Sequence, residues 1–519
     1  MDTTQPIAEA VAILGNRIAT VGSTAETQTL AGPRTRTIDA GGNTLLPGFN
    51  DSHVHFLAGG FSLGNVDLRQ TLSLDELADG VRDYAARLPK GSWILGGDWD
   101  HEKWPGAPLP TKAVIDAVLR DYPVFINRLD GHMALANSLA LRFAGITKQT
   151  PDPPGGVIVR DCASGEPTGL LKDAAQSLVE RVIPEKTFEE KRAAALAATR
   201  HAAQAGVTSL TDVSAGEDVG LYQFMAQRGE LKTRIYALHS IVSWDVLAKA
   251  GVRAAFGGDM LRFGGLKGFA DGSLGSSTAL FFEGYSDAPE NRGLLFDQML
   301  PEGIMFQRVE RADRLGLQVM IHAIGDEANS RILDLYQAVA EKNGAADRRF
   351  RIEHAQHLRP TDIPRFGRQM VIASMQPYHA ADDGRWCEKR IGPARAKSAY
   401  AFRSLLDSGA VLAFGSDWTV APLNPLEGIK AAVTRQTLDG KYPGGWFPEQ
   451  RITLDEALRA YTLGSAYAEF CDKAKGTITP GKLADVVLLD RDLYKIDPIQ
   501  INQAKVLLTV MDGNILYQR

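Results

Sequence analysis

The residues Leu45-Leu-Pro-Gly-Phe-Asn-Asp-Ser-His-Val-His55 form a short apolar run that ends in two histidines. His53 and His55 flank Val54, and on a strand residues two apart project to the same side. Two imidazoles on one side of a strand end can reach a single metal ion. A histidine pair in a turn can equally make ordinary hydrogen bonds. The rest of the chain has to decide between these two interpretations.

Seven more apolar runs follow along the chain, and helical patterns separate them. Each of these runs ends at a recognisable residue: Asp212, His239, Lys267, His322, His354, Gln376 and Asp417. Strands of a parallel barrel are buried on both faces, so such a barrel requires apolar runs that alternate with helices. With the run that ends at His53 there are eight runs. The sequence therefore predicts an α/β fold, a TIM (β/α)8 barrel.

Both ends of the chain have another pattern, in which short β-rich runs are broken by turns. These runs are Ala10–Leu14, Arg17–Gly22, Thr35–Asp39, Ala484–Asp490 and Lys505–Met511, and Asp512-Gly513 after the last one is a hairpin turn signal. We therefore expect a composite β-sandwich domain made from residues 1–46 and 476–519.

The predicted hydrolase barrel occupies residues 47–475, with one long interruption after its first strand. This stretch, about residues 60–185, is rich in Trp, Gly and Pro. A (β/α)8 barrel takes roughly 250 residues and accepts large insertions, so a chain of this length fits one elaborated barrel. We interpret the interruption as an inserted subdomain above the barrel.

The composition narrows the classes of partner. The 519 residues carry a formal net charge of -5, which provides no basic field for nucleic acid or an anionic membrane. A small-molecule substrate is the better expectation, and a homo-oligomer stays open. The cysteines Cys162, Cys387 and Cys471 are odd in number and far apart, which argues against a disulfide framework or a thiolate zinc site. With no apolar membrane run and no signal-peptide pattern at the start, we expect a cytoplasmic protein.

The strand ends carry the residues that could perform chemistry. His322 closes one apolar run, His354 the next, and Asp417 the last. A single histidine after a strand is often structural, and a single aspartate is often a helix cap. Four histidines and a carboxylate at barrel strand ends one, five, six and eight form a combined pattern of nitrogen and oxygen ligands that zinc-like ions prefer.

This order of motifs resembles the amidohydrolase superfamily and, within it, the amidohydrolase-3 group of YtcJ-like proteins and N-substituted formamide deformylases. The resemblance covers nearly the whole chain. It rests on Leu46-Pro-Gly-Phe-Asn-Asp-Ser-His-Val-His55, Asp130-Gly-His-Met-Ala-Leu-Ala-Asn137, Lys267-Gly-Phe-Ala-Asp-Gly-Ser273, Ile321-His-Ala-Ile-Gly-Asp326, Arg351-Ile-Glu-His354, Gly415-Ser-Asp-Trp418 and Gly481-Lys-Leu-Ala-Asp-Val-Val487.

The resemblance implies a binuclear metal centre. It places His53, His55 and Asp417 on one ion, His322 and His354 on a second, and Lys267 between them as a carboxylated lysine, a carbamate derived from carbon dioxide. Zinc is the expected metal, although other transition metals would suit the same ligands. A lysine ammonium cannot ligate a cation, whereas a carbamate offers anionic oxygens. Without the resemblance, Lys267 would be interpreted as a rim lysine.

The same resemblance implies the chemistry. A metal ion lowers the pKa of its bound water and polarises a carbonyl. Asp417 would be the catalytic residue that takes the proton from the attacking water and passes it to the departing amine. We therefore expect hydrolysis of a non-peptide carbon–nitrogen bond, in an amide or N-substituted formamide. A carbamate, ester, lactone, cyclic amide or phosphoester hydrolase would need the same six residues, and a catalytically silent binding barrel would lack one of them.

Five residues are candidates for substrate binding: Trp99, His132, Asp271, Tyr378 and Trp418. The Asp130-Gly-His132 segment faces the site according to the resemblance, but it also fits a turn in which Asp130 bonds its own backbone. Asp271 fits a pocket wall or a helix cap. The aromatic residues, with Trp104, fit an apolar pocket or ordinary packing.

The beginning of the chain differs from the family pattern. Members of the group begin with a further strand or two ahead of this start, which leaves two interpretations open. Either the β domain is trimmed, or the true start lies upstream and could include a signal peptide.

Overall fold

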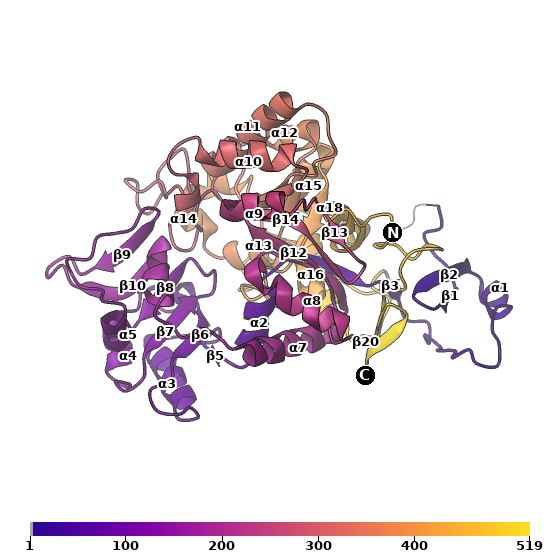
Figure 1. Cartoon of the computed structure of the whole chain (residues 1–519), viewed down its shortest axis with the longest axis horizontal. Helices are drawn as coiled ribbons and strands as arrows, with labels where there is room; N and C mark the ends of the chain where they lie inside the picture. Colours follow the sequence, from indigo (N-terminus) through magenta and orange to yellow (C-terminus); the bar gives the residue numbers. More distant parts are fainter. Residues whose placement is uncertain (1–3) are drawn as a thin grey trace.

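A computed structural model, which describes residues 4–519, has the predicted barrel at its centre (Figure 1). Eight parallel strands form it, and their order in space follows their order in the sequence. They are β4 Phe49–Val54, β11 Val207–Asp212, β12 Arg234–Ser240, β14 Leu261–Phe269, β15 Gln318–Ala323, β16 Arg351–His354, β17 Ile372–Met375 and β18 Leu412–Phe414. All eight predicted strands are confirmed. A short antiparallel strand, β13 (Phe256–Gly257), also pairs with β14.

The barrel closes between its first and last strands through a few backbone contacts. The Asp417 amide donates to the His53 carbonyl at 2.7 Å, and the His55 amide donates to the Trp418 carbonyl at 2.8 Å. Val54 and Trp418 form an isolated parallel bridge. This closure joins the segment that carries both N-terminal histidines directly to the segment that carries Asp417.

Burial explains why the runs form barrel strands. Every residue of β4, β11 and β15 is buried, as expected for strands covered on both faces. Helices pack around the barrel and share its apolar core. The main ones are α2 Phe56–Ser62, α7 Phe188–Gln204, α8 Val219–Gln227, α9 Trp244–Lys249, α10 Ile304–Arg314, α11 Asp326–Asn343, α12 Ile363–Gln369, α13 Pro377–Asp383, α14 Cys387–Ala396, α15 Phe402–Asp407, α16 Pro425–Thr434, α17 Leu454–Arg459 and α18 Ser465–Ala468.

The stretch between α2 and α7 contains a second sheet, which lies beside the barrel in Figure 1. The sheet has the order β5-β6-β7-β8-β10-β9. Its elements are β5 Val66–Asp67, α3 Leu74–Ala85, β6 Ile94–Trp99, α4 Lys112–Asp116, β7 Val124–Arg128, β8 Met133–Ala136, α5 Ser138–Phe143, β9 Gly156–Arg160, β10 Pro167–Asp173 and α6 Ser177–Glu180. Two apolar clusters, with members only from this stretch, fill it. We call residues 60–185 the insert below.

The two ends of the chain meet in a four-stranded sheet of order β21-β20-β19-β3. Its strands are β3 Leu45–Pro47, β19 Val486–Leu489, β20 Val506–Met511 and β21 Asn514–Gln518. The predicted hairpin at Asp512-Gly513 joins β20 to β21. A buried ion pair between Arg234 of the barrel and Asp485, at 2.7 Å, ties this sheet to the barrel.

The first two predicted strands, β1 Ala10–Leu14 and β2 Arg17–Gly22, form a separate two-stranded sheet, and the short helix α1 (Thr24–Gln28) follows them. The prediction of a strand at Thr35–Asp39 is wrong, because this segment has no regular structure. All five of its residues are exposed, so the run has no partner strand and no apolar surface to cover. A β-rich composition alone does not form a strand when no partner strand lies beside it.

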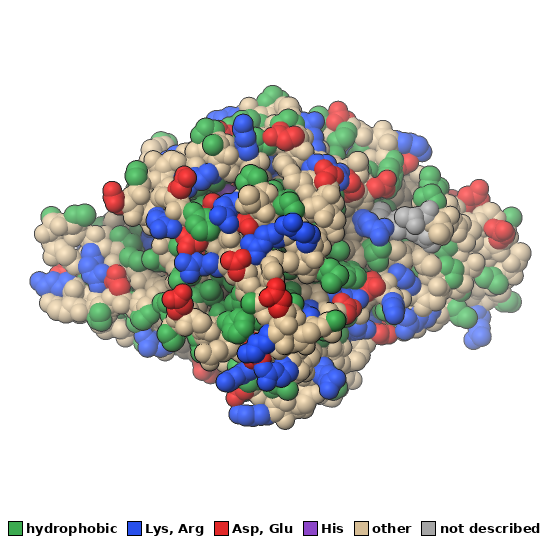
Figure 2. Space-filling view, turned by 90° about the horizontal axis from the view of Figure 1, so that it is seen from above, with side chains coloured by type: hydrophobic (Ala, Val, Ile, Leu, Met, Phe, Trp, Pro, Cys, Tyr) green, Lys and Arg blue, Asp and Glu red, His purple; other side chains and the backbone are tan. Residues whose placement is uncertain are grey.

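The surface gives no sign of a single dominant charge on the face drawn in Figure 2, where acidic and basic side chains are interspersed with apolar ones. Within residues 4–519, no helix combines the length and the apolar composition that crossing a membrane would need.

Candidate metal centre

The six residues expected at the metal site gather at the carboxyl ends of the barrel strands, where parallel strands bring their ends together. His53 lies in β4 and His55 directly after it, Lys267 lies in β14, and His322 lies in β15. His354 is the last residue of β16, and Asp417 lies three positions beyond the end of β18. All except His55 are buried.

Asp417 lies among the imidazoles. Its Oδ1 atom is 3.3 Å from Nε2 of His55 and 3.6 Å from Nε2 of His53, and its Oδ2 atom is 4.0 Å from Nδ1 of His354. The Nζ atom of Lys267 is 3.5 Å from Nε2 of His53. The rings of His322 and His354 have centroids 4.6 Å apart. The structure therefore brings all six predicted ligands together.

The donor atoms of this cluster fit a divalent cation. One donor atom from each of His53, His354 and Asp417 lies within 4.8 Å of the other two. The Oδ1 atom of Asp417 is buried and makes no hydrogen bond with residues 4–519. A buried carboxylate oxygen without a hydrogen bond is costly unless a cation occupies the space beside it. Imidazole nitrogen with carboxylate oxygen is also the ligand chemistry that zinc-like ions prefer.

Burial keeps His53, His322 and His354 in the neutral form that binds metals. Burial lowers the pKa of His53 to about 4, and the nearby Lys267 acts in the same direction. Burial also holds the pKa of His322 and His354 well below the ordinary value. A histidine must be neutral to offer a lone pair to a cation. These three side chains are therefore ready to ligate without first losing a proton near neutral pH.

Sequence reasoning missed the group that orients His53. The Nδ1 atom of His53 lies 2.5 Å from Oε2 of Glu353, and the exposed fractions of these side chains are 1% and 0%. The Arg351 guanidinium pairs with Glu353 at 2.7 Å. A carboxylate on one ring nitrogen fixes the ring and directs the other nitrogen at the metal position. The sequence did contain a signal for this group. Arg351 and Glu353 are charged residues two positions apart in a strand buried on both faces, and buried charges of this kind need a specific partner.

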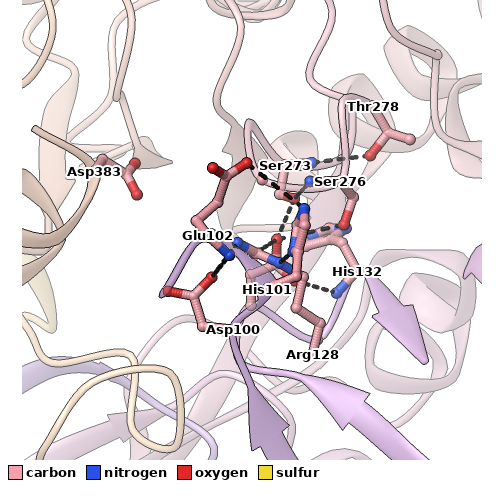
Figure 3. Close-up of polar contacts among 12 residues, drawn as sticks. Asp100, His101, Glu102, Arg128, His132, Ser273, Ser276, Thr278 and Asp383 are labelled. Carbon is pink, nitrogen blue, oxygen red and sulfur yellow. Dashed lines mark hydrogen bonds and ion pairs between the residues drawn. The ribbon is translucent and has the colours of Figure 1, made fainter. Parts of the chain in front are cut away.

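A cavity of about 440 Å³ opens above the cluster. The barrel contributes Phe269, Ser273, Phe296, His379 and Trp386 to its lining, while the insert contributes Arg128, Asp130, His132, Asp173 and Glu180. In Figure 3 the labelled residues of the insert and of the loop after β14 meet in one network of polar contacts. The insert therefore forms part of the wall above the cluster.

His132 is the predicted substrate-binding residue that lines this cavity. Its ring centroid is 5.1 Å from that of His322. The alternative, a turn in which Asp130 bonds the local backbone, also holds, because Oδ1 of Asp130 accepts from the His132 amide at 3.2 Å. The two interpretations are compatible, since the turn directs the imidazole at the site.

The two predicted tryptophans lie outside the cavity lining. Trp99 is fully buried in the insert, where its Nε1 donates to the Ile126 carbonyl and its ring stacks on Trp104. Trp418 packs against His201, with ring centroids 5.1 Å apart. Both side chains are thus used in packing, so the expectation of an aromatic pocket made by them is corrected.

Asp271 and Tyr378 also lie outside the lining. Asp271 is buried, and its carboxylate accepts from the backbone amides of Leu280, Ile324 and Gly325. Its Oδ1 atom is 3.5 Å from Nε2 of His322, so the Asp271 carboxylate lies next to the ring of a predicted metal ligand. Tyr378 is half-buried in α13, one residue before His379, which does line the cavity. In this turn of α13 the cavity is thus lined by the neighbour of the predicted residue.

Comparison with protein families agrees with this geometry. The model of the Amidohydrolase family, Amidohydro_3, matches residues 36–517. The chain is 42% identical to Protein LONG AFTER FAR-RED 3 of Arabidopsis thaliana, over 99% of this chain and 89% of that protein. It is 34% identical to YtcJ of Bacillus subtilis, over 94% of this chain and 91% of the relative.

Two further similarities concern chemistry and fold. The chain is 28% identical to N-substituted formamide deformylase of Arthrobacter pascens, with 100% of this chain and 96% of that enzyme covered. A solved structure of an uncharacterized metal-dependent hydrolase from Pyrococcus horikoshii matches with a TM-score of 0.76 and 29% identity, over 94% of both chains.

Proposed function

This chain belongs to the amidohydrolase family, and we propose that it hydrolyses a carbon–nitrogen bond outside peptides, in an amide or an N-substituted formamide. The products would be an amine and a carboxylic acid. The observation that carries the proposal is the buried cluster of His53, His354 and Asp417, whose donor atoms lie within 4.8 Å of one another at the floor of a cavity. The relation to N-substituted formamide deformylase supports the choice of bond.

Six residues would hold the metal. We assign His53, His55 and Asp417 to one ion and His322 and His354 to a second, with Lys267 as a bridging carbamate. The proximity of Lys267 to His53 and of His322 to His354 supports this arrangement. A bound divalent ion would supply Lewis-acid polarisation of the carbonyl and a lower pKa for the attacking water.

Asp417 would move the proton. Its carboxylate takes a proton from the water as the new carbon–oxygen bond forms, and it returns that proton to the nitrogen as the carbon–nitrogen bond breaks. No net proton is gained or lost in this exchange. The absence of a hydrogen bond on the buried Oδ1 atom supports the role, because this oxygen has a free lone pair.

The first test is metal content. We expect purified protein to hold about one to two equivalents of zinc or a similar ion, and chelation should abolish hydrolysis. Elemental analysis of the wild-type protein measures this directly. Protein without metal whose hydrolysis is unaffected by chelators would contradict the metal assignment.

The second test is the class of bond. A panel of chromogenic amides, formamides, carbamates, esters and lactones should give the highest kcat/KM with an amide or a formamide. A higher kcat/KM with an ester, lactone or carbamate would contradict the proposed substrate class but not the proposed metal site. Protein that holds metal and hydrolyses no member of the panel would favour a binding barrel.

A further inference from the structure

A histidine and an aspartate of the insert form a close pair above the metal cluster. The Nδ1 atom of His132 lies 2.6 Å from Oδ1 of Asp173. The Asp173 amide also donates to the His132 carbonyl at 3.0 Å, so the two residues are joined through both backbone and side chain. Both side chains line the cavity. The other ring nitrogen of His132, Nε2, makes no hydrogen bond with residues 4–519.

The pair lies directly against a predicted metal ligand. The Gly272 carbonyl is 3.0 Å from Nε2 of His322, and a Cβ atom on Gly272 would come within 2.9 Å of Oδ1 of Asp173. The same Cβ atom would lie 2.0 Å from Oγ1 of Thr278, so glycine at this position lets the loop after β14 fold on itself and lets the insert approach it. Together with the ring contact between His132 and His322, this places the imidazole of His132 beside the cluster.

A polar clamp holds this part of the insert in place (Figure 3). Oδ2 of Asp130 accepts from the Ser273 hydroxyl at 2.5 Å and pairs with the Arg128 guanidinium at 2.7 Å. Oδ1 of the same carboxylate accepts from the His132 amide. Asp130 thus fixes the backbone of His132 relative to a barrel loop, and the contact with Asp173 holds the imidazole itself.

The backbone of Asp173 is in a conformation that a side chain rarely adopts. Its φ and ψ angles are 47° and -125°. Such angles are unfavourable and persist where the surrounding structure enforces them, frequently at functional sites. One oxygen of this buried carboxylate, Oδ2, also makes no hydrogen bond within residues 4–519. The fold therefore tolerates two unfavourable features in order to hold the other oxygen against His132.

We propose that His132 binds the scissile amide group of the substrate through Nε2, and that Asp173 is a positioning residue that fixes the imidazole for this contact. The inference rests on the proposed function and deepens it. An aspartate on Nδ1 selects the orientation and tautomer of the ring and leaves Nε2 for the substrate. The insert thereby supplies part of the reactive site.

Two substitutions at His132 separate a substrate contact from a structural role. In Asn the amide nitrogen replaces Nδ1 and can keep the bond to Asp173, whereas in Gln a polar atom replaces Nε2. We expect His132→Asn to lower kcat/KM about tenfold or more, as for a lost hydrogen bond to substrate, and His132→Gln to retain more activity than His132→Asn. Equal activity in both variants and the wild type, or better activity in the Asn variant, would overturn the proposal.

Substitutions at Asp173 test the positioning role. Asp173→Asn keeps an acceptor for Nδ1 and should retain most activity, whereas Asp173→Ala removes the acceptor and should lower kcat/KM about tenfold. Asp161→Asn, in the exposed turn between β9 and β10, is a matched control that should equal the wild type. An Asp173→Ala variant that is folded, holds metal and is fully active would contradict the role.

Two readouts distinguish this inference from the proposed function. The His132 variants should keep the metal content of the wild type, and a loss of metal from His132→Asn would show a ligand instead of a substrate contact. Affinity for acetohydroxamic acid, a carbonyl compound that binds metals, can be measured even if the wild type cleaves none of the panel. It should weaken in His132→Asn and recover in His132→Gln, and unchanged affinity in both variants would overturn the proposal independently of turnover.

Discussion

Asp417 shows how a single position can combine three demands. Its φ angle of 57° is unusual for a residue with a side chain, its amide takes part in the closure of the barrel, and its carboxylate lies among three imidazoles. A positive φ is tolerated best by Gly, Asn and Asp. A substitution that tests the carboxylate should therefore preserve both the shape and the backbone preference of this residue.

Asn meets both conditions at position 417. We expect Asp417→Asn to lower kcat by about a hundredfold or more, because a proton shuttle typically contributes 10²–10⁴-fold. Turnover of the best amide in the panel is the measurement, with circular dichroism as a check of folding. Near-normal turnover in this folded variant would remove Asp417 from proton transfer.

Lys267 is a buried lysine that makes no ion pair with the residues described here. Its Nζ atom lies near His53 and above the ring of Phe269, at 4.8 Å from the centroid. A buried ammonium without a carboxylate partner is unusual. Carboxylation would form a carbon–nitrogen bond between the neutral amine and carbon dioxide, with release of one proton, and would replace the cation by an anionic ligand.

We therefore predict that Lys267→Ala loses metal and activity together, and that acetate or propionate partly restores both by occupying the bridging position. Lys267→Arg is the matched control and should not recover, because guanidinium stays cationic and offers no anionic oxygen. Metal content and turnover are measured with and without the acid. A crystal structure with a bare Lys267 side chain turned away from an occupied metal pair would refute the carbamate.

At the scale of elements, the closure between β4 and β18 depends on a glycine. A Cβ atom on Gly415 would lie 2.6 Å from both Oδ1 of Asp51 and the backbone nitrogen of His53. Asp51 is buried and accepts from the Ser416 amide at 2.9 Å, so it has little room to move. The close approach of the two segments is what places His53 opposite Asp417.

We expect Gly415→Ala to lower the free energy of unfolding by about 1–3 kcal/mol, as overpacking does, and to weaken metal binding as well. Gly220→Ala in α8 is the control, because nothing lies within 4 Å of its Cβ position and alanine favours a helix. Chemical denaturation and metal titration measure the two effects. A Gly415→Ala variant as stable as the wild type would show that the two segments can separate enough to accommodate a Cβ atom.

At the scale of the whole molecule, the two ends of the chain stabilise each other and the barrel. Strand β19 pairs with β3, which leads directly into β4, and Asp485 neutralises the buried Arg234 of β12. Removal of residues 476–519 would leave β3 without a partner and Arg234 without its carboxylate. A buried charge without a partner typically costs 3–5 kcal/mol, and exposed strand edges promote aggregation.

We therefore predict that a chain ending at residue 475 is insoluble when expressed. A chain ending at residue 513, which lacks only the edge strand β21, is the control and should stay soluble because β19 and Asp485 remain. The soluble fraction and the unfolding temperature are the measurements. A soluble and active truncation at residue 475 would mean that the barrel does not need this sheet.

Much of the fold and of the candidate site could be predicted from local sequence. Each barrel strand is a continuous apolar run because both of its faces are buried, and a residue at the end of such a run lies at the rim where all eight ends meet. His322 and His354 could therefore be placed at this rim from their own apolar runs, and their joint pattern with His53, His55 and Asp417 made them candidate ligands. The resemblance then supplied Lys267, which no local pattern distinguishes from a surface lysine.

The tertiary structure alone decided contacts between residues far apart in the sequence. Glu353 meets His53 across 300 positions, and Asp173 meets His132 across 41. Local patterns report the burial of a side chain but not the partner that it meets, which is why Trp99 and Trp418 resembled pocket residues and proved to be packing residues. The strand expected at Thr35–Asp39 failed for the same reason, because a strand is stable only beside another strand, and its composition does not say whether one is there.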